Sequence, residues 1–209
     1  MKINVLKISV FIAICLTGQT AFAQDSAKKS EFVKLNDLKN EFAFDMRYAT
    51  ANNFLKEKVY PCATCLVRID VSKALLKANA LFKQKGYKIK FYDCYRPVDV
   101  QKKMWAIKPD SRYVANPNKS GSIHNRGAAV DMTLVDANGK ELDMGTEFDH
   151  FGIEAHHSYQ KLSAQILENR KYLKQVMEQC GFVAQATEWW HYNYGDRSRY
   201  TISNEELCK

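Results

Sequence analysis

The sequence lacks several patterns that mark common functional classes. No block of lysines and arginines is interleaved with aromatic residues, so we expect no nucleic-acid partner. No repeat or linker-like segment follows residue 30, which favours one folded domain. The CxxC motif from Cys62 to Cys65 occurs once, so the second pair that would complete a zinc knuckle is missing.

The N-terminus has the pattern of a secretory signal peptide. A basic start precedes an apolar run over residues 8–16, and the small residues Ala21 and Ala23 mark a cleavage site after Ala23. The run is too short to span a bilayer, and a lipoprotein signal at Cys15 is disfavoured because the preceding residue is not small. We predict a leader over residues 1–23, secretion across the inner membrane into the periplasm, and no stable membrane insertion.

The chain that follows the leader is long enough for one domain with a sizeable core. We expect residues 24–30 to be a flexible polar segment and residues 31–209 to form a single domain. The formal net charge of +8 falls slightly when the leader is removed, because the leader carries two lysines and no acid. A charge of this size favours solubility, and weak association with anionic wall or membrane polymers is the alternative.

An odd number of cysteines lies outside the leader: Cys62, Cys65, Cys94, Cys180 and Cys208. An oxidising destination favours disulfides, with at least one thiol left over or bonded to another molecule. The CATC run could be half a zinc site, a redox pair or a local disulfide, but no thioredoxin-like strand and helix surround it. We favour a structural disulfide that involves Cys62, Cys65 or both, and we assign no catalytic role to them.

Apolar periodicity predicts an α+β fold. Helices are expected over residues 70–86, from about residue 98, and over about 157–180. The first helix has Asp70 or Ser72 as its candidate N-cap, and alternating residues predict strands over 87–93 and 130–134. We expect the helices to cover one face of a small antiparallel sheet.

Two short segments carry candidate metal ligands. SIHNRGAAVD runs from Ser122 to Asp131 and contains His124, while EWWH runs from Glu188 to His191. A catalytic zinc has three protein ligands, leaves its fourth position to water, and needs a nearby carboxylate to take that water's proton. His124, Asp131 and His191 fit the ligand role and Glu188 fits the base. Each segment alone is weak evidence, because a lone His is more often a hydrogen-bonded structural residue.

Strand geometry sets a condition on this site. Seven residues separate His124 from Asp131, and an unbroken strand with this odd step would place the two side chains on opposite faces. A turn or bulge is therefore required, and Gly127 permits one. By the same argument Glu188 should lie on a turn, with a strand beginning close to the tryptophans that follow it.

Other aromatic and imidazole side chains near these segments have structural interpretations. The alternating aromatics from Trp189 to Tyr194 are expected in the core, with one tryptophan at most in a substrate wall. Three further histidines are expected to form hydrogen bonds rather than to bind metal: His150, His156 and His157.

The two segments resemble the SxHxxGxAxD and ExWH motifs of the zinc D,D-peptidases, a family that shares a fold with the hedgehog signalling domain. Further stretches resemble its D-alanyl-D-alanine dipeptidase branch: DMRYATANNF (45–54), YDCYRP (92–97), MGTEFDHFGIEAHH (144–157) and TEWWHY (187–192). The resemblance extends in order over nearly all of the chain after the leader. It implies a hedgehog/D,D-peptidase-like zinc fold and hydrolysis of the dipeptide D-alanyl-D-alanine.

The resemblance also implies roles for individual residues. One Zn²⁺ per chain would be bound by His124, Asp131 and His191, with Glu188 as general base and then general acid. The implied roles of Arg96, Asp149 and Ser122 concern the substrate.

Arg96 would donate hydrogen bonds to the oxyanion of the tetrahedral intermediate, and Asp93, three residues earlier, would orient it. Without the resemblance, Arg96 would be read as a surface cation after a strand. Asp149 would bind the ammonium of the dipeptide and Ser122 its carboxylate. Cys94 stands where the family often has Gly, and the CATC insert is unusual, so the loop before the first helix is expected to differ.

Two rival functions remain at this point. A D,D-carboxypeptidase that trims stem peptides would tolerate substrates with an acylated amino group. A non-catalytic, zinc-containing binding module, as in the animal relatives of the fold, would need no base, so the presence of Glu188 and Arg96 speaks against it.

Overall fold

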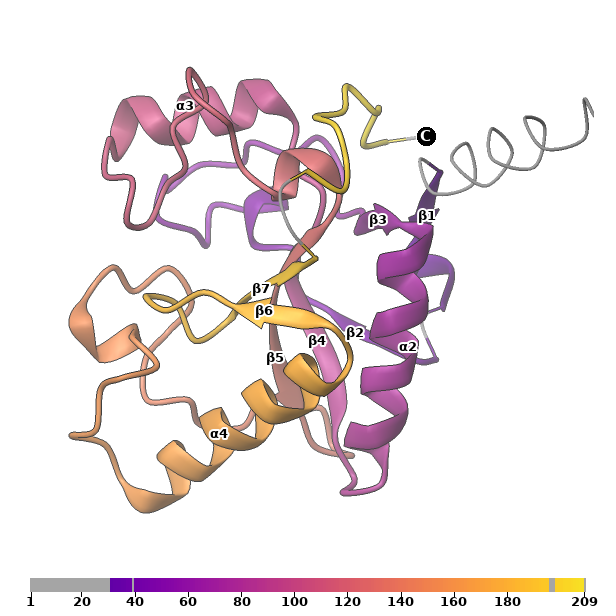
Figure 1. Ribbon diagram of the computed structural model, residues 1–209, viewed down its shortest axis with the longest axis vertical. Coiled ribbons are helices and arrows are strands. Elements are labelled where there is room, and N and C mark those ends of the chain that lie inside the picture. Colours follow the sequence, from indigo (N-terminus) through magenta and orange to yellow (C-terminus); the bar gives the residue numbers. More distant parts are fainter. Residues whose placement is uncertain (1–30, 39, 196–197, 209) are drawn as a thin grey trace, which may run out of the picture.

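The computed structural model describes residues 31–38, 40–195 and 198–208 (Figure 1). The predicted leader and the predicted flexible segment lie outside the described residues. Within the described ranges, no helix is both long enough and apolar enough to cross a membrane.

The centre of the fold is a five-stranded sheet with the order β2-β4-β5-β7-β6. Its strands are β2 (Ala43–Phe44), β4 (Lys88–Asp93), β5 (Ala129–Val135), β6 (Phe182–Ala184) and β7 (His191–Tyr194). The predicted strands over 87–93 and 130–134 correspond to β4 and β5. A separate two-stranded antiparallel sheet joins β1 (Phe32–Lys34) to β3 (Leu66–Arg68).

The sheet is mixed rather than wholly antiparallel. Strand β2 runs parallel to β4, while the other neighbouring pairs are antiparallel. The chain between β2 and β4 passes through β3 and a helix, and this long crossover returns it in the same direction. The α+β class is confirmed, with this one parallel edge strand as the difference.

Three α-helices complete the described fold: α2 (Ile69–Lys83), α3 (Val98–Ile107) and α4 (Ala164–Gln179). Helices α2 and α4 contact each other and strands of the sheet, as expected for helices that cover one face. Helix α3 lies at the other end of the molecule from α4 (Figure 1). Its buried Gln101 donates to Ala115 O in the loop that follows the helix, and its buried Met104 lines the site cavity described below.

Two helix starts differ from the predictions. Helix α4 begins at Ala164 rather than near residue 157, because Ser163 caps it by accepting a hydrogen bond from Ile166 N. Helix α2 has Arg68 as its N-cap, so neither Asp70 nor Ser72 fills that role. The Ser72 hydroxyl lies inside the first turn and donates to Ile69 O at 2.7 Å.

The expected disulfides are present. Cys62 bonds to Cys208 and Cys65 bonds to Cys94, so both cysteines of the CATC run take part but not with each other. Cys180 is a buried free thiol. A cross-link of either kind typically stabilises a domain by about 2–4 kcal/mol. The Cys65–Cys94 bond also anchors the chain just after β4, two residues before Arg96.

Candidate active site

A row of side chains crosses three strands of the sheet. Asp131 on β5 is the register partner of His191 on β7 and of Asp93 on β4. A β-bulge between Phe91 and Asp93 shifts the register of β4 by one residue. Because side chains alternate between faces, this shift turns Asp93 to the face that carries Asp131 and His191.

His124 reaches the same place from a turn. It begins the short 3-10 helix η3 (His124–Arg126), which ends at Gly127 in the left-handed conformation with φ of +67°. A Cβ atom at Gly127 would also collide with the Phe32 ring, so both backbone and space require glycine. The predicted turn between His124 and Asp131 is therefore confirmed.

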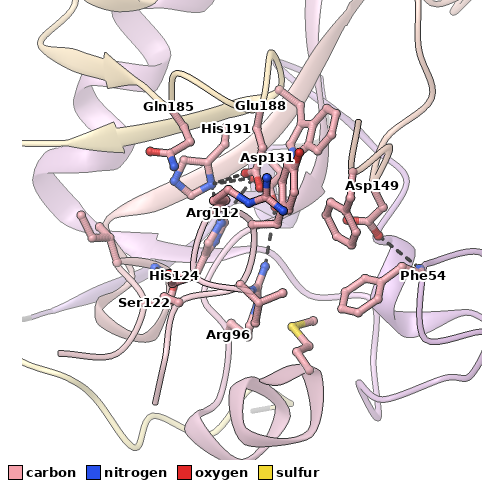
Figure 2. A pocket seen from close by; sticks show the side chains of 18 of the residues that line it. Phe54, Arg96, Arg112, Ser122, His124, Asp131, Asp149, Gln185, Glu188 and His191 are labelled. Carbon is pink, nitrogen blue, oxygen red and sulfur yellow. Dashed lines mark hydrogen bonds and ion pairs between the residues drawn. The ribbon is translucent and has the colours of Figure 1, made fainter. Parts of the chain in front are cut away.

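Three potential ligand atoms face one another at this point. His124 Nε2 lies 3.1 Å from His191 Nδ1, which lies 3.0 Å from Asp131 Oδ1, and the third side of the triangle is 3.4 Å (Figure 2). A tetrahedral site with metal–ligand distances of about 2.0–2.1 Å would have ligand–ligand distances of about 3.3–3.4 Å. The cluster therefore has the dimensions of a compact metal site.

The second ring nitrogen of each histidine identifies which atom is free to bind a metal. His124 Nδ1 donates to Cys94 O at 2.7 Å, and His191 Nε2 donates to Asn193 Oδ1 at 2.8 Å. The opposite nitrogens then carry lone pairs, and both point toward the carboxylate of Asp131. Two such lone pairs and a carboxylate oxygen at these distances are stabilised by a cation between them, which can be a proton on His191 Nδ1 or a metal ion. The residues thus fit a divalent metal ion.

Glu188 lies on a turn beside this cluster, as predicted. Its backbone N–H donates to Gln185 O and its carbonyl accepts from His191 N, directly before β7 begins. The side chain is only 6% exposed, and Oε2 lies 3.8 Å from His191 Nδ1. Burial raises the pKa of Glu188 to about 8, although the nearby His191 opposes the shift. A carboxylate in this environment holds a proton more readily than one in water.

Arg96 is buried next to the cluster and is held in one orientation. Its Nε and Nη2 donate to Asp93 Oδ2 at 3.0 and 2.7 Å, and Nη1 donates to Gln101 Oε1 at 3.0 Å. Asp93 is itself fixed, because its other oxygen accepts from the Tyr60 hydroxyl at 2.8 Å. Nη2 also lies 3.7 Å from Asp131 Oδ2, and each terminal nitrogen keeps one N–H outside these hydrogen bonds.

Asp149 occupies another part of the pocket. Its carboxylate accepts hydrogen bonds from the Tyr48 hydroxyl at 3.0 Å and from Phe54 N at 3.3 Å. Burial and then the charge of Asp131 raise the pKa of Asp149 to about 7, against the effect of Tyr48. The residue has φ of +62°, a left-handed conformation that aspartate tolerates better than most residues.

Ser122 also lines the pocket, where its Oγ accepts a hydrogen bond from His124 N at 3.2 Å. All the site residues expected from the sequence border one cavity of about 130 Å³, apart from Asp93, which lies behind Arg96. Pockets for drug-sized ligands measure about 300–1,000 Å³, so the cavity suits a small substrate.

The structure also clarifies the remaining aromatic and imidazole side chains. Trp190 lines the cavity, whereas the indole N–H of Trp189 donates to Thr146 away from it. None of the three spare histidines joins the metal cluster found among the described residues. His150 pairs with Glu154 on the surface, for example.

Four residues of the site were not predicted: Tyr48, Tyr60, Gln101 and Arg112. Tyr48 lies inside the matched stretch over 45–54, so the resemblance could have indicated it. Tyr60 and Arg112 carry no local signal, because Tyr60 contacts Asp93 and Arg112 contacts Thr187 across the fold. Gln101 lies only five residues after Arg96, but no motif in the sequence marks that pair.

Comparisons with known proteins bear on this geometry. A sequence profile of the family described as D-ala-D-ala dipeptidase matches residues 28–207. The chain is 33% identical over 178 residues to a D-alanyl-D-alanine dipeptidase of Escherichia coli (strain K12), covering 85% of this chain and 92% of the relative. It is 32% identical to one of Enterococcus faecium, covering 77% and 90%.

Solved structures give a weaker likeness. A vancomycin resistance D,D-pentapeptidase, VanY, in complex with Zn(II), matches with a TM-score of 0.42 and 16% identity over 66% of this chain and 78% of that one. The L-Ala D-Glu endopeptidase ChiX of Serratia marcescens matches with a TM-score of 0.38 and 16% identity, over 78% and 97% of the two chains.

Proposed function

This chain belongs to the D-ala-D-ala dipeptidase family, and we propose that it hydrolyses the free dipeptide D-alanyl-D-alanine to two molecules of D-alanine. One observation carries the proposal. Two imidazole lone pairs and a carboxylate converge at 3.0–3.4 Å, beside a buried glutamate and in a cavity of about 130 Å³.

We propose that His124, Asp131 and His191 hold one Zn²⁺ ion per chain. When bound, zinc acts as a Lewis acid that makes water more acidic and polarises a carbonyl group. The carbonyl of Cys94 and the amide of Asn193 keep the two imidazoles in the orientation and tautomer that this requires.

Glu188 is the proposed general base and acid. Its carboxylate takes a proton from the attacking water as the new C–O bond forms, and then gives that proton to the leaving amine as the C–N bond breaks. A raised pKa supports both steps, because the group must bind the proton in the first and release it in the second. Burial also keeps bulk water from competing for the proton.

Arg96 is proposed to stabilise the negative charge that develops on the carbonyl oxygen. Asp93 and Gln101 fix three of its N–H groups and leave the other two in place before the substrate arrives. Donors of this kind lower the activation barrier by about 3–4 kcal/mol in related chemistry. Asp93 is thus a positioning residue that acts through Arg96.

Asp149 is proposed to bind the ammonium of the dipeptide, and Ser122 to contact its carboxylate. An acylated amino group carries no charge. A substrate of that kind would leave the buried carboxylate of Asp149 without a positively charged partner, which weakens binding. This difference supports a dipeptidase over a D,D-carboxypeptidase.

The test compares purified protein on free D-alanyl-D-alanine, its N-acetylated form and the L,L-dipeptide. We expect the N-acetyl group to lower kcat/KM by at least about 10²-fold, because it removes the charged partner of Asp149. Equal rates on the free and acetylated substrates would favour the carboxypeptidase. Zinc binding without turnover on any peptide would favour the binding module.

Asp149 should also make substrate binding depend on pH. Its pKa of about 7 means that the ammonium-binding carboxylate is lost as pH falls below 7, while the substrate amine loses its own charge above about 8. KM should therefore be lowest between these values and rise on the acidic side. Asp149→Asn should raise KM about 10- to 100-fold and remove the acidic limb.

The matched control for this change is Asp99→Asn, an exposed aspartate on α3 whose side chain is 92% accessible. We expect it to leave KM unchanged at every pH. An acidic limb that persists in Asp149→Asn would assign the titration to another group.

We propose further that the protein is exported to the periplasm through the leader at residues 1–23. The two disulfides support an oxidising destination. Because cytoplasmic enzymes make the cell-wall precursor, an exported dipeptidase would act on dipeptide released by wall turnover. Recovery of D-alanine then fits better than antibiotic resistance.

A further inference from the structure

We propose that Arg112 binds the C-terminal carboxylate of the substrate and makes the site selective for peptides with a free carboxylate. This inference rests on the proposed dipeptidase function and adds a residue to it. Three acids and two arginines line the cavity: Asp131, Asp149, Glu188, Arg96 and Arg112.

The substrate carboxylate needs a positive partner that the other residues do not supply. Arg96 is already paired with Asp93, and its remaining N–H groups have the proposed role at the oxyanion. Ser122 is neutral, and its oxygen already accepts from His124 N, so it offers one hydroxyl hydrogen. Hydrogen bonds from a cation to a carboxylate are about twice as strong as neutral ones. Among the cavity-lining residues, Arg112 is the remaining cation.

Asp110 holds the Arg112 guanidinium without using all of it. Nε donates to Asp110 Oδ1 at 3.0 Å and Nη2 donates to Oδ2 at 2.6 Å. Nη1 has no hydrogen-bond partner within the described part of the chain, so this nitrogen is available to a ligand. Asp110 does not line the cavity, and it therefore anchors the guanidinium from outside.

The loop that carries Arg112 is tied to the catalytic groups on both sides. The Arg112 carbonyl accepts from the Thr187 hydroxyl at 3.0 Å, next to Glu188. Gln101, which holds Arg96, donates to Ala115 O at 2.7 Å. Figure 2 shows Arg112 on the side of Asp131 and His191, apart from Asp149. A cation and an acid at separate places match the two ends of a zwitterionic dipeptide.

Arg112→Gln tests the inference in the full mature protein loaded with zinc. The two substrates are D-alanyl-D-alanine and its C-terminal amide, which has the same shape without the negative charge. The Arg112 side chain is 71% exposed, so solvent weakens its attraction. We expect KM for the acid to rise about 3- to 30-fold, with kcat and the constants for the amide little changed. Arg112→Lys should recover part of the loss.

The control is Lys119→Gln, an exposed cation on the same loop that does not line the cavity. It should change neither substrate's KM. An Arg112→Gln variant with unchanged KM for the acid, or with equal increases for acid and amide, would overturn the inference while wild-type turnover keeps the proposed function intact. A wild type that neither binds nor cleaves the dipeptide would overturn both.

Discussion

Replacing Glu188 with glutamine is expected to lower kcat by about 10²- to 10⁴-fold while leaving zinc content unchanged. Glutamine keeps the size of the side chain but cannot accept the proton of the attacking water. The carboxylate lies 3.8 Å from His191 Nδ1 and outside the triangle of ligand atoms, so the metal site should survive the change. Steady-state kinetics with metal analysis of the same preparation measure both quantities.

Glu154→Gln is the matched control for this prediction. Glu154 is partly exposed and pairs with His150, so it contacts none of the proposed ligands. Its turnover should equal that of the wild type. Wild-type turnover in Glu188→Gln would remove the residue from the mechanism. Loss of zinc from that variant would instead show that Glu188 supports the metal.

His124→Ala is expected to lose both zinc and turnover, with kcat/KM reduced by at least about 10³-fold. Only His191 and Asp131 would then face the site, and two ligands hold a zinc ion poorly. A chelator should inactivate the wild type, and added zinc should restore it. Binding of zinc should also raise the melting temperature of the wild type but not of His124→Ala, because a ligand stabilises only the state that binds it.

His150→Ala controls for the removal of an imidazole, since His150 lies on the surface beside Glu154. We expect it to keep one zinc per chain and full turnover. A His124→Ala variant that retained one zinc and wild-type kinetics would contradict the proposed ligand set. Recovery of the chelated wild type by magnesium but not by zinc would contradict the proposed metal.

The geometry also bears on why the substrate would be a free dipeptide. The cavity holds about 130 Å³, and the carboxylate of Asp149 is held in place by Tyr48 and Phe54. A longer peptide would have to place an uncharged amide against that carboxylate. Recognition of the ammonium by Asp149 and of the carboxylate by Arg112 would therefore select dipeptides over longer peptides.

Cys94 takes part both in a disulfide that stabilises the fold and in a hydrogen bond that orients a proposed zinc ligand. Cys94 bonds to Cys65, and its carbonyl accepts from His124 Nδ1. The backbone atom that orients a proposed zinc ligand is therefore fixed by a covalent bond. The sequence indicated that Cys94 was unusual at this position, but it did not indicate this connection.

The sequence by itself determined the local features of the fold and of the site. The strand period predicted that a turn at Gly127 must separate His124 from Asp131, and that Glu188 must precede its strand. These are properties of a few consecutive residues, because side-chain alternation and the left-handed conformation of glycine do not depend on the rest of the chain. The motifs supplied the family, and with it the expected ligands.

The tertiary structure decided which distant residues meet. The bulge that turns Asp93 toward Asp131 depends on how β4 pairs with β5, and Cys62 finds its partner 146 residues away. Arg112 borders the cavity on a loop that is hydrogen-bonded to Thr187, 75 residues further along. Such contacts form when separate segments pack around one core. The hydrophobic period within one segment does not predict which other segments it will contact.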